Sequence, residues 1–394
     1  MKKTIACLLL FSSCVSNTNR VQQEEVLISE LPYIVSLEKE ITNIQQIGLS
    51  DVGSSITYIP LETNNRSLLK ELRKIIVTDS CIVVRDMDRI LMFDFSGNFL
   101  RQIGRRGQGP GEFNSRSIFD YCFSHDNNKI YVLTGNFICF EFNVEGKFLN
   151  SFKIDSMPGQ MLPFKDDLFV FQCINGPEYV SPVRQSLIVS DLNNNIQKSY
   201  PNYHKRVNKP GVTFPRLPFY YHQNELRFKE LGVDTLYTVT EDELIPHAIF
   251  QLGNKEIPAD LHTLNLDMEK ALRPYSGRFW FRELVEDLDN FYFTLEDDHN
   301  KLYGYFNKPS NIAKVIGDQG FQNNIDGGMP FFPKYVYNDN ILVDYVNAFE
   351  LQEHVLNSNA SEMRRLYGQK YDDLVKFVNS LDDDANPIVV LIRK

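Results

Sequence analysis

Residues 91–100 read LMFDFSGNFL, and the same pattern returns at residues 140–149 as FEFNVEGKFL. Both stretches have an alternating apolar strand, a turn of the form Asp/Asn-x-x-Gly, and a second strand that opens with Phe-Leu. The turn glycines are Gly97 and Gly146. Alternating strands on either side of a short glycine-containing turn predict a β-hairpin. The repeated hairpin is therefore the unit from which we expect the fold to be built.

A third copy and several further strand pairs extend the repeat along the chain. Residues 187–196, LIVSDLNNNI, place Asn194 where the first two copies have glycine, and asparagine tolerates a positive φ better than most residues. A period of about 40–50 residues with several strands in each repeat is typical of propeller blades. No Pro/Gly/Ser-rich linker separates the copies, which makes a tandem β-sandwich the less favoured alternative. The predicted blades span residues 72–104, 117–154, 160–200, 215–252, 275–316 and 330–394.

The two ends of the repeat region predict how the ring closes. An early strand at 54–62 (SSITYIPLE) and a final strand at 387–394 (PIVVLIRK) have no neighbouring partner in sequence. Joining them in one blade would remove exposed sheet edges. Residues 359–380 carry apolar side chains at helical spacing, and Asn359 and Glu362 are placed as in a capping box. We predict an all-β, six-bladed β-propeller closed by N- and C-terminal strands, with a short helical insertion near the C-terminus.

These features, together with GQGPGEF at residues 107–113, resemble the six-bladed β-propeller lipoproteins of Bacteroidetes, which are distant relatives of NHL-repeat propellers. The resemblance covers residues 54–394, and the glycine-rich stretch is its most specific element. It implies the propeller fold and a place in the cell envelope. It carries over no catalytic residue, because the activity of that family is mostly undefined.

The first residues of the chain predict export and a lipid anchor. Lys2 and Lys3 precede an apolar stretch at 5–11 that is too short to span a bilayer. The following Ser-Ser-Cys14 resembles a lipobox, in which a signal peptidase cuts before the cysteine and the thiol is acylated. An ordinary secretory signal and a shortened membrane helix are the alternatives. The predicted segments are a lipoprotein signal peptide (1–13), a lipidated tether with an N-terminal extension (14–53), and the propeller (54–394).

Charge and cysteine pattern narrow the possible partners. A net charge of −10 disfavours nucleic acid, whose phosphates attract basic surfaces. The cysteines beyond Cys14 form no CxxC pair, which argues against zinc-ribbon and thioredoxin-like sites. Cys81 and Cys139 lie among apolar strand residues and are expected to be buried. The histidines form no HxH or HExxH motif, so we predict no metal and no cofactor.

The glycines at 107, 109 and 111 raise the question of a phosphate-binding loop. They do not fit GxGxxG, because residue 112 is glutamate, and no helical pattern follows them. We predict instead a connector from the outer strand of one blade to the inner strand of the next, where glycine and proline supply unusual backbone angles. Arg105 and Arg106 are then expected to contact no ligand.

Two stretches combine arginine with aromatic residues, FPRLPFYYH at 214–222 and GRFWFRE at 277–283. This mixture can stack on sugars or planar ligands and bind carboxylates. The alternative is that these aromatic rings pack between blades. The candidate ligand-binding residues are Arg216, Tyr220, Tyr221, His222, Arg278, Trp280 and Arg282.

No GxSxG or other catalytic signature is present in the sequence. We therefore predict an outer-membrane lipoprotein, facing the periplasm or the outside, that binds an envelope protein or a carbohydrate or peptide ligand. The principal alternative is an envelope lyase or hydrolase, possibly carbohydrate-active, with its site at one propeller mouth. Such an enzyme would place two or more buried carboxylates or histidines within hydrogen-bonding reach there. A purely structural subunit with a broad apolar patch is the third possibility.

Overall fold

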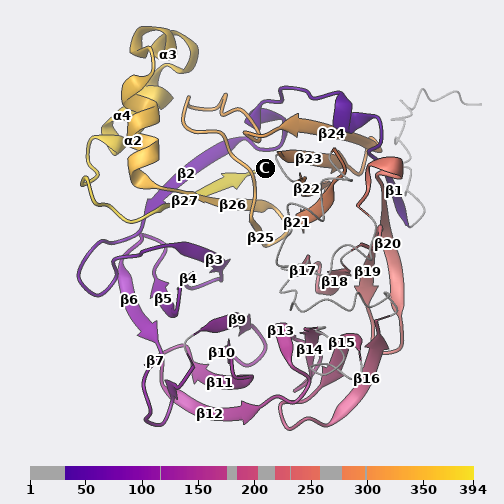
Figure 1. Ribbon diagram of the computed structural model, residues 1–394. Coiled ribbons are helices and arrows are strands. Elements are labelled where there is room, and N and C mark those ends of the chain that lie inside the picture. The colour runs from indigo at the N-terminus through magenta and orange to yellow at the C-terminus, as the bar shows by residue number, and fades with distance from the viewer. Residues whose placement is uncertain are drawn as a thin grey trace, which may run out of the picture.

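The repeated hairpins form six sheets arranged around a central axis, as Figure 1 shows. The computed structural model describes residues 32–115, 117–174, 184–202, 218–230, 232–257, 277–297 and 300–394. In each sheet the strands are antiparallel and follow one another from the axis outward, apart from additions by the N-terminal segment. The predicted six-bladed β-propeller is confirmed.

Five blades are each built from four strands that are consecutive in the chain. These strands are β3 (Leu72–Val77), β4 (Ile82–Asp86), β5 (Arg89–Phe93) and β6 (Phe99–Ile103) in blade 1; β9 (Ile118–Ser124), β10 (Lys129–Thr134), β11 (Ile138–Asn143) and β12 (Phe148–Lys153) in blade 2; β13 (Pro158–Pro163), β14 (Phe169–Cys173), β15 (Gln185–Ser190) and β16 (Ile196–Pro201) in blade 3; β17 (Phe219–His222), β18 (Glu225–Lys229), β19 (Thr235–Val239) and β20 (Leu244–Gln251) in blade 4; and β21 (Trp280–Glu286), β22 (Asn290–Glu296), β23 (Lys301–Asn307) and β24 (Ile312–Gly317) in blade 5.

The turn that defines the repeat has the predicted backbone conformation in all three copies. The φ angles are 84° at Gly97, 77° at Gly146 and 67° at Asn194. In the first copy, one carboxylate oxygen of Asp94 accepts hydrogen bonds from the backbone N–H groups of Ser96 and Asn98. The aspartate or asparagine therefore folds the turn, and the residue with positive φ lets the next strand return alongside the first.

The sixth blade joins the two ends of the repeat region, as predicted. It consists of β25 (Tyr335–Tyr337), β26 (Ile341–Val346), β27 (Ile388–Arg393) and β2 (Ser55–Pro60), with β2 outermost. Strand β2 is antiparallel to β27, and Ile56 lies opposite Ile392. The first five residues of β27 are buried, so the final strand contributes apolar surface to the core as well as hydrogen bonds to the ring.

Residues that precede β2 pack against the propeller. Strand β1 (Tyr33–Ser36) is parallel to β20 and adds a fifth strand at the outer edge of blade 4. Two short 3-10 helices follow, η1 (Glu40–Thr42) and η2 (Leu49–Asp51), and each buries an apolar side chain against the core. The sequence analysis did not predict this strand and placed residues 14–53 in one extension.

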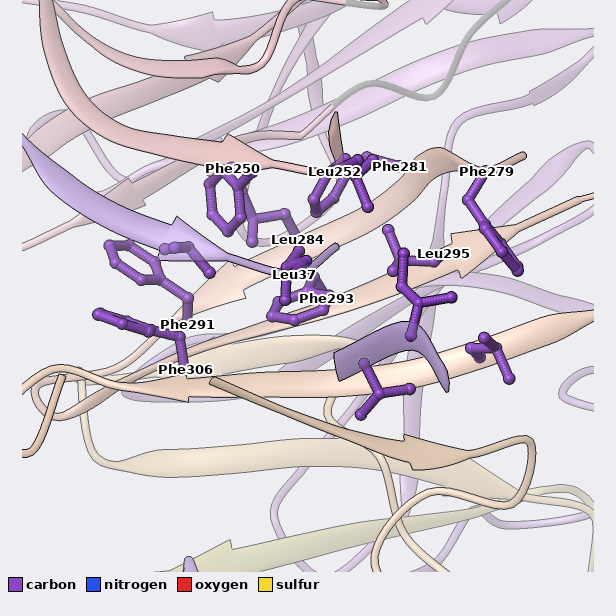
Figure 2. Packing of buried hydrophobic residues seen from close by; sticks show 14 of the residues in the cluster. Leu37, Phe250, Leu252, Phe279, Phe281, Leu284, Phe291, Phe293, Leu295 and Phe306 are labelled. Atoms are coloured by element: carbon purple, nitrogen blue, oxygen red, sulfur yellow. The ribbon is translucent and has the colours of Figure 1, made fainter. Parts of the chain in front are cut away.

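The core lies between neighbouring blades, where their apolar faces meet. Figure 2 shows one such layer between blades 4 and 5, in which Leu37 also takes part. The Phe250 ring of blade 4 meets the Phe281 ring of blade 5 edge-on, with centroids 4.9 Å apart. Phe279 and Phe281, which flank the candidate residue Trp280, belong to this layer. Aromatic packing between blades thus accounts for part of the aromatic composition.

The insertion between β26 and β27 is helical, as predicted, and contains α2 (Ala348–Asn357), α3 (Ala360–Tyr367) and α4 (Gln369–Val378). The Asn359 side chain accepts a hydrogen bond from the backbone N–H of Glu362 at 3.3 Å, which confirms the predicted cap. Gly368, with a φ of 58°, separates α3 from α4. Among the described residues, no helix is long and apolar enough to cross a membrane.

The glycine-rich stretch is a connector between the outer strand β6 of blade 1 and the inner strand β9 of blade 2, as predicted. Two short parallel strands, β7 (Arg105–Arg106) and β8 (Glu112–Phe113), shape it. The Glu112 carboxylate accepts hydrogen bonds from the Gly109 N–H at 2.9 Å and from Arg105 Nε at 2.6 Å. Positive φ angles occur at Gly104 and Gly111, and Gly109 has none. The Gly109 N–H and Arg105 thus bond to a carboxylate of the same loop.

The cysteines of the described chain are buried and form no disulfide. They are Cys81, Cys122, Cys139 and Cys173. Burial raises the pKa of the Cys122 thiol well above its usual value, and that of Cys173 to about 12. Cys81 and Cys139 are buried, as predicted; Cys139 lies in β11, whereas Cys81 directly precedes β4 and is not part of the strand. Such thiols act as small apolar side chains in the core.

Candidate functional site

The first strands of the blades, β3, β9, β13, β17, β21 and β25, surround the central axis (Figure 1). Because each chain segment moves outward through its blade and then crosses to the next inner strand, the inner strands run in the same direction. We call the end of the central axis where these strands begin the upper mouth, and the end where they finish the lower mouth. Each mouth carries a group of polar residues.

Four of the inner strands are bulged near the upper mouth. In β3, β9, β13 and β21 the pairing with the next strand skips one residue. The skipped residues are Arg73, Phe119, Gly159 and Arg282. A bulge leaves the extra residue out of the ladder and redirects its side chain, and bulges are common beside functional sites. The same type of bulge therefore recurs in four inner strands near the upper mouth, where it directs side chains away from the sheet.

Three of the bulged residues line a cavity of about 310 Å³ at the upper mouth. The cavity lies where blades 1, 2 and 3 meet, with Arg73, Phe119 and Gly159 in its wall. Because Gly159 has no side chain, the third bulge leaves space that the other two fill. A volume of this size lies at the lower limit for small-molecule sites. The other lining residues that bear on its chemistry are Lys74, Arg85, Asp120, Gln160, Gln172 and Ile174.

Hydrogen bonds between blades hold the polar lining in place. Lys74 Nζ of blade 1 lies 2.6 Å from Asp120 Oδ1 of blade 2 and donates to the Tyr121 carbonyl at 2.8 Å. The other Asp120 oxygen accepts from the Met161 N–H of blade 3 at 3.0 Å. Arg85 Nη1 donates to a blade 2 carbonyl at 2.8 Å. The polar atoms are thus fixed by the protein itself, which lowers the entropy cost of binding a ligand.

The lower side of the interface between blades 4 and 5 contains a buried charge cluster around Glu286, the last residue of β21. One carboxylate oxygen accepts from Lys308 Nζ at 2.6 Å and lies 2.9 Å from His247 Nε2. The other accepts from Arg227 Nε at 3.3 Å and from the Tyr220 hydroxyl at 3.5 Å. We call these five residues the Glu286 cluster. Both oxygens are occupied, as a buried carboxylate requires.

The partners of Glu286 keep it ionised. Burial alone would raise its pKa, but the hydrogen bond from His247 and the charges of Lys308, His247 and His222 lower the pKa to about 2. Burial also lowers the pKa of Lys308, against the opposing effect of Glu286. A carboxyl group with so low a pKa cannot exchange a proton near neutral pH. The cluster therefore behaves as a permanent ionic contact between two blades.

His222 lies beside this cluster at the end of β17. Its Nε2 is 3.7 Å from a Glu286 oxygen, and its Nδ1 is 3.0 Å from Asp339 Oδ1 on the turn between β25 and β26. Burial lowers the pKa of His222, and the nearby Glu286 carboxylate opposes this effect. Asp339 also accepts from the backbone N–H of Gln223 at 3.2 Å. These contacts connect blades 4, 5 and 6 at the lower mouth.

The structure separates the sequence-predicted site residues into two groups. Tyr220 and His222 meet at the Glu286 cluster, while the exposed Tyr221 donates a hydrogen bond to the Pro163 carbonyl of blade 3. On blade 5, Trp280 begins β21, Arg278 precedes it, and Arg282 is the exposed bulged residue, with its Nε 3.6 Å from Glu296. Arg216 and Cys14 lie outside the described residues. Ligand contact by the seven candidates stays a prediction.

The residues around the upper-mouth cavity were missed by the sequence analysis. They are spread from position 73 to position 174 over three blades. The available signal was the pair of cations in the inner half of blade 1, where Lys74 lies opposite Arg85. Within the described part of the chain, no group of three or more His, Cys, Asp or Glu residues is arranged to hold a metal ion.

The described strands form a six-bladed propeller with a cavity of about 310 Å³ at its upper mouth. A family model described as a domain of unknown function, DUF4934, matches residues 32–393, so the chain belongs to this family. A search of curated proteins finds no match.

Two solved structures share the fold. One is a protein of Bacteroides fragilis NCTC 9343 described as a candidate exported protein, with a TM-score of 0.69 and 16% identity over 92% of this chain and 99% of that chain. The other is a member of the DUF4221 family from Bacteroides vulgatus ATCC 8482, with a TM-score of 0.52 and 13% identity over 87% of this chain and 97% of that chain. The predicted resemblance to propellers of Bacteroides is supported at the level of fold, while its lipoprotein and NHL parts stay predictions.

Proposed function

We propose that this protein is a lipid-anchored binding module of the cell envelope that takes its ligand at the upper mouth of the propeller. The observation that carries the proposal is the cavity of about 310 Å³ at the junction of three blades, with bulged strands directed at it. Its fixed polar lining suits recognition of one ligand. Binding is favoured over catalysis because the carboxylate of the lining, Asp120, is already held by Lys74 and the Met161 N–H.

The location in the envelope rests on different observations. The Ser-Ser-Cys14 stretch follows a short apolar segment in the sequence, and a structural relative is described as a candidate exported protein. Acylation of Cys14 would hold the propeller at a membrane surface. Replacement of Cys14 by serine should abolish labelling by a fatty-acid analogue and release the protein from membranes. Unchanged fractionation and labelling would contradict the anchor without bearing on the cavity.

The binding role can be tested by closing the cavity. The Gly159→Phe substitution gives blade 3 the side chain that blade 2 carries at its own bulge, Phe119. A Cβ at Gly159 would lie 3.2 Å from the Ile174 side chain, which can shift, and Gly159 has no positive φ. The matched control is Thr57→Phe, at an exposed position of the outermost strand β2.

The measurement is the thermal shift of wild type and both variants with a panel of sugars, sugar acids and short peptides. We expect at least one compound to stabilise wild type and Thr57→Phe and to leave Gly159→Phe unchanged. A panel without any effect, or a shift that survives in Gly159→Phe, would contradict the proposed site.

An envelope enzyme is the second candidate, and one observation favours it. Glu286 and His247 lie within 2.9 Å of each other, which meets the distance criterion for paired catalytic groups. Glu286 is however ionised and bonded on both oxygens, so it has no proton to give and no free lone pair directed at a substrate. A hydrolase or lyase activity that is lost in a folded Glu286→Gln variant would support the enzyme.

A further inference from the structure

The cavity at the upper mouth has a charge opposite to that of the whole protein. Its lining contains three cationic side chains, Arg73, Lys74 and Arg85, and one carboxylate, Asp120. The lining residues alone carry an excess of two positive charges in a protein of net charge −10, and the solvent-exposed Glu71, which pairs with Arg73, offsets part of this excess. In a concave site, such an excess attracts anions and raises their local concentration.

The cations occupy different positions in the wall. Lys74 is held by Asp120, and the buried Arg85 is held by the Phe119 carbonyl, so both are fixed in the lining. Arg73 is the bulged residue of β3; its side chain is 34% exposed, and its Nη2 pairs with the exposed carboxylate of Glu71 at 2.9 Å. A guanidinium group presents several N–H donors in one plane and binds carboxylate, sulfate or phosphate through paired hydrogen bonds.

A buried amide in the same wall needs a partner. Gln172 is 4% exposed and lies opposite Gln160 in the β13–β14 pair. Its Oε1 is shielded from solvent and accepts no hydrogen bond from any described residue. A buried amide oxygen without a hydrogen bond costs free energy, and few such groups occur in native proteins. A ligand hydroxyl or amide that bonds to the Gln172 side chain would remove this cost.

The remaining wall is apolar. Phe119, Ile118 and Ile174 line the cavity beside the polar groups. The Phe119 ring is held edge-on against Phe137, with centroids 5.7 Å apart. An aromatic ring and aliphatic side chains next to hydrogen-bonding groups suit a ligand that has a carbon ring with polar substituents.

We propose that the upper-mouth cavity binds a small hydroxylated organic anion, such as an acidic sugar, with its anionic group toward Arg73 and Arg85 and a hydroxyl group at Gln172. This inference rests on the proposed function, which makes the cavity the ligand site, and adds the class of ligand. Carboxylate, sulfate ester and phosphate ester share the chemistry that the arginines recognise. The test therefore includes one probe of each kind.

The experiment is isothermal titration calorimetry with four probes that share a hexose ring: D-glucuronate, D-glucose 6-sulfate, D-glucose 6-phosphate and D-glucose. We expect at least one acidic probe to bind about tenfold or more tightly than D-glucose, since a charge-assisted hydrogen bond contributes about that factor. Raising the ionic strength should lower the affinity for the acidic probe and leave the affinity for D-glucose unchanged, because salt screens the attraction between charges. The acid that binds most tightly identifies the anionic group.

Variants assign the roles of individual residues. Arg73→Gln should lower the affinity for the acidic probe by about tenfold and leave the affinity for D-glucose unchanged. Gln172→Met keeps the length of the side chain and removes the amide. It should lower the affinity for both the acidic and the neutral probes. Arg106→Gln is the matched control, because Arg106 is an exposed residue of the connector and is not part of the cavity wall. Thermal unfolding of each variant checks that it is folded. If Gln172→Met is unstable, Arg73→Gln still tests the proposal, because Arg73 is partly exposed and its replacement disturbs the fold less.

The possible outcomes separate the two proposals. If neutral compounds bind, Gly159→Phe abolishes their binding, and no acidic probe binds more tightly, the ligand class is wrong and the site stands. If an acidic probe binds equally well to wild type and Arg73→Gln, the orientation proposed for the anion is wrong. If no compound of either set binds, both proposals are contradicted.

Discussion

Both mouths of the propeller contain ionic contacts between blades, but these contacts have different roles. At the lower mouth, Glu286 is surrounded by Lys308, Arg227 and His247, and each oxygen of its carboxylate is bonded. At the upper mouth, Lys74 and Asp120 also form an ionic contact between blades, but beside a cavity and beside the Gln172 amide oxygen, which accepts no hydrogen bond from the described part of the chain. A polar group that is fully bonded by its own protein stabilises the fold. One that is fixed in place yet incompletely bonded is available to a ligand.

The largest expected effect comes from removing the lower-mouth carboxylate. Glu286→Gln would leave the buried Lys308 without its ion-pair partner and Arg227 with only the exposed Glu225 carboxylate, and breaking a buried ion pair in this way costs about 3–5 kcal/mol. The free energy of unfolding, measured with urea, should fall by that amount. The control is Glu283→Gln, on the same strand with a side chain 43% exposed, which should change stability little. Equal effects of the two variants would contradict the structural role of the cluster.

Acid should weaken the lower mouth in a defined pH range. The pKa of Glu286 is about 2 in the folded protein, against an ordinary value of 4.5. Its contribution to stability is therefore fully present above about pH 4.5 and is lost as the pH falls toward 2, by about 3 kcal/mol. The pKa of His222 is lowered from 6.5, so the unfolded chain takes up that proton first and stability also falls below pH 6.5. Urea unfolding of wild type and Glu286→Gln at pH 7, 5 and 3 should show a shallower pH dependence in the variant.

A smaller effect is expected at the upper mouth. Asp120→Asn removes the charge opposite Lys74 but keeps an oxygen for the Met161 N–H. Because the Lys74 side chain is 30% exposed, water can partly replace the lost partner, and we expect a loss of about 1–2 kcal/mol. The same urea titration measures it. A loss of stability as large as that caused by Glu286→Gln would show that the ionic contacts at the two mouths stabilise the fold equally.

The smallest effect is expected for the arginines of the connector. Arg105 pairs with Glu112 on the surface, its side chain being 77% exposed, and Arg106 is also exposed. Replacing both by alanine should change stability by no more than about 0.5 kcal/mol each. Binding of the acidic hexose should be unchanged, since neither residue lines the cavity. Loss of binding in this double variant would move the anion site from the cavity to the glycine-rich connector.

The sequence predicted those parts of the fold that depend on local patterns. Gly97, Gly146 and Asn194 mark a turn whose backbone angles only a few residue types adopt, so the repeat could be recognised without a structure. The isolated strands at the two ends predicted the closure of the ring because an unpaired strand edge is unfavourable. The four residues of β1 form a parallel edge strand, for which so short a segment carries no distinctive pattern.

The two polar sites could not be predicted in the same way. The partners of Glu286 come from positions 220 to 308, and their meeting depends on how blades 4 and 5 pack. The upper cavity depends on bulges at Arg73, Phe119 and Gly159, and a bulge is a feature of strand pairing. Tyr220 and His222 were selected for their aromatic and polar character, which is equally suited to an ionic cluster and to a ligand site.

The most direct test of the difference between the mouths is hydrogen–deuterium exchange with and without the acidic hexose that binds most tightly. We expect the ligand to slow exchange in the inner strands at the upper mouth, at residues 72–74, 118–120 and 159–161, and to leave the lower-mouth turns unchanged. Those turns are at residues 223–224, 287–289 and 338–340. Slowed exchange at the lower turns, with none at the upper strands, would place the ligand at the Glu286 cluster and contradict the assignment of binding to the upper mouth.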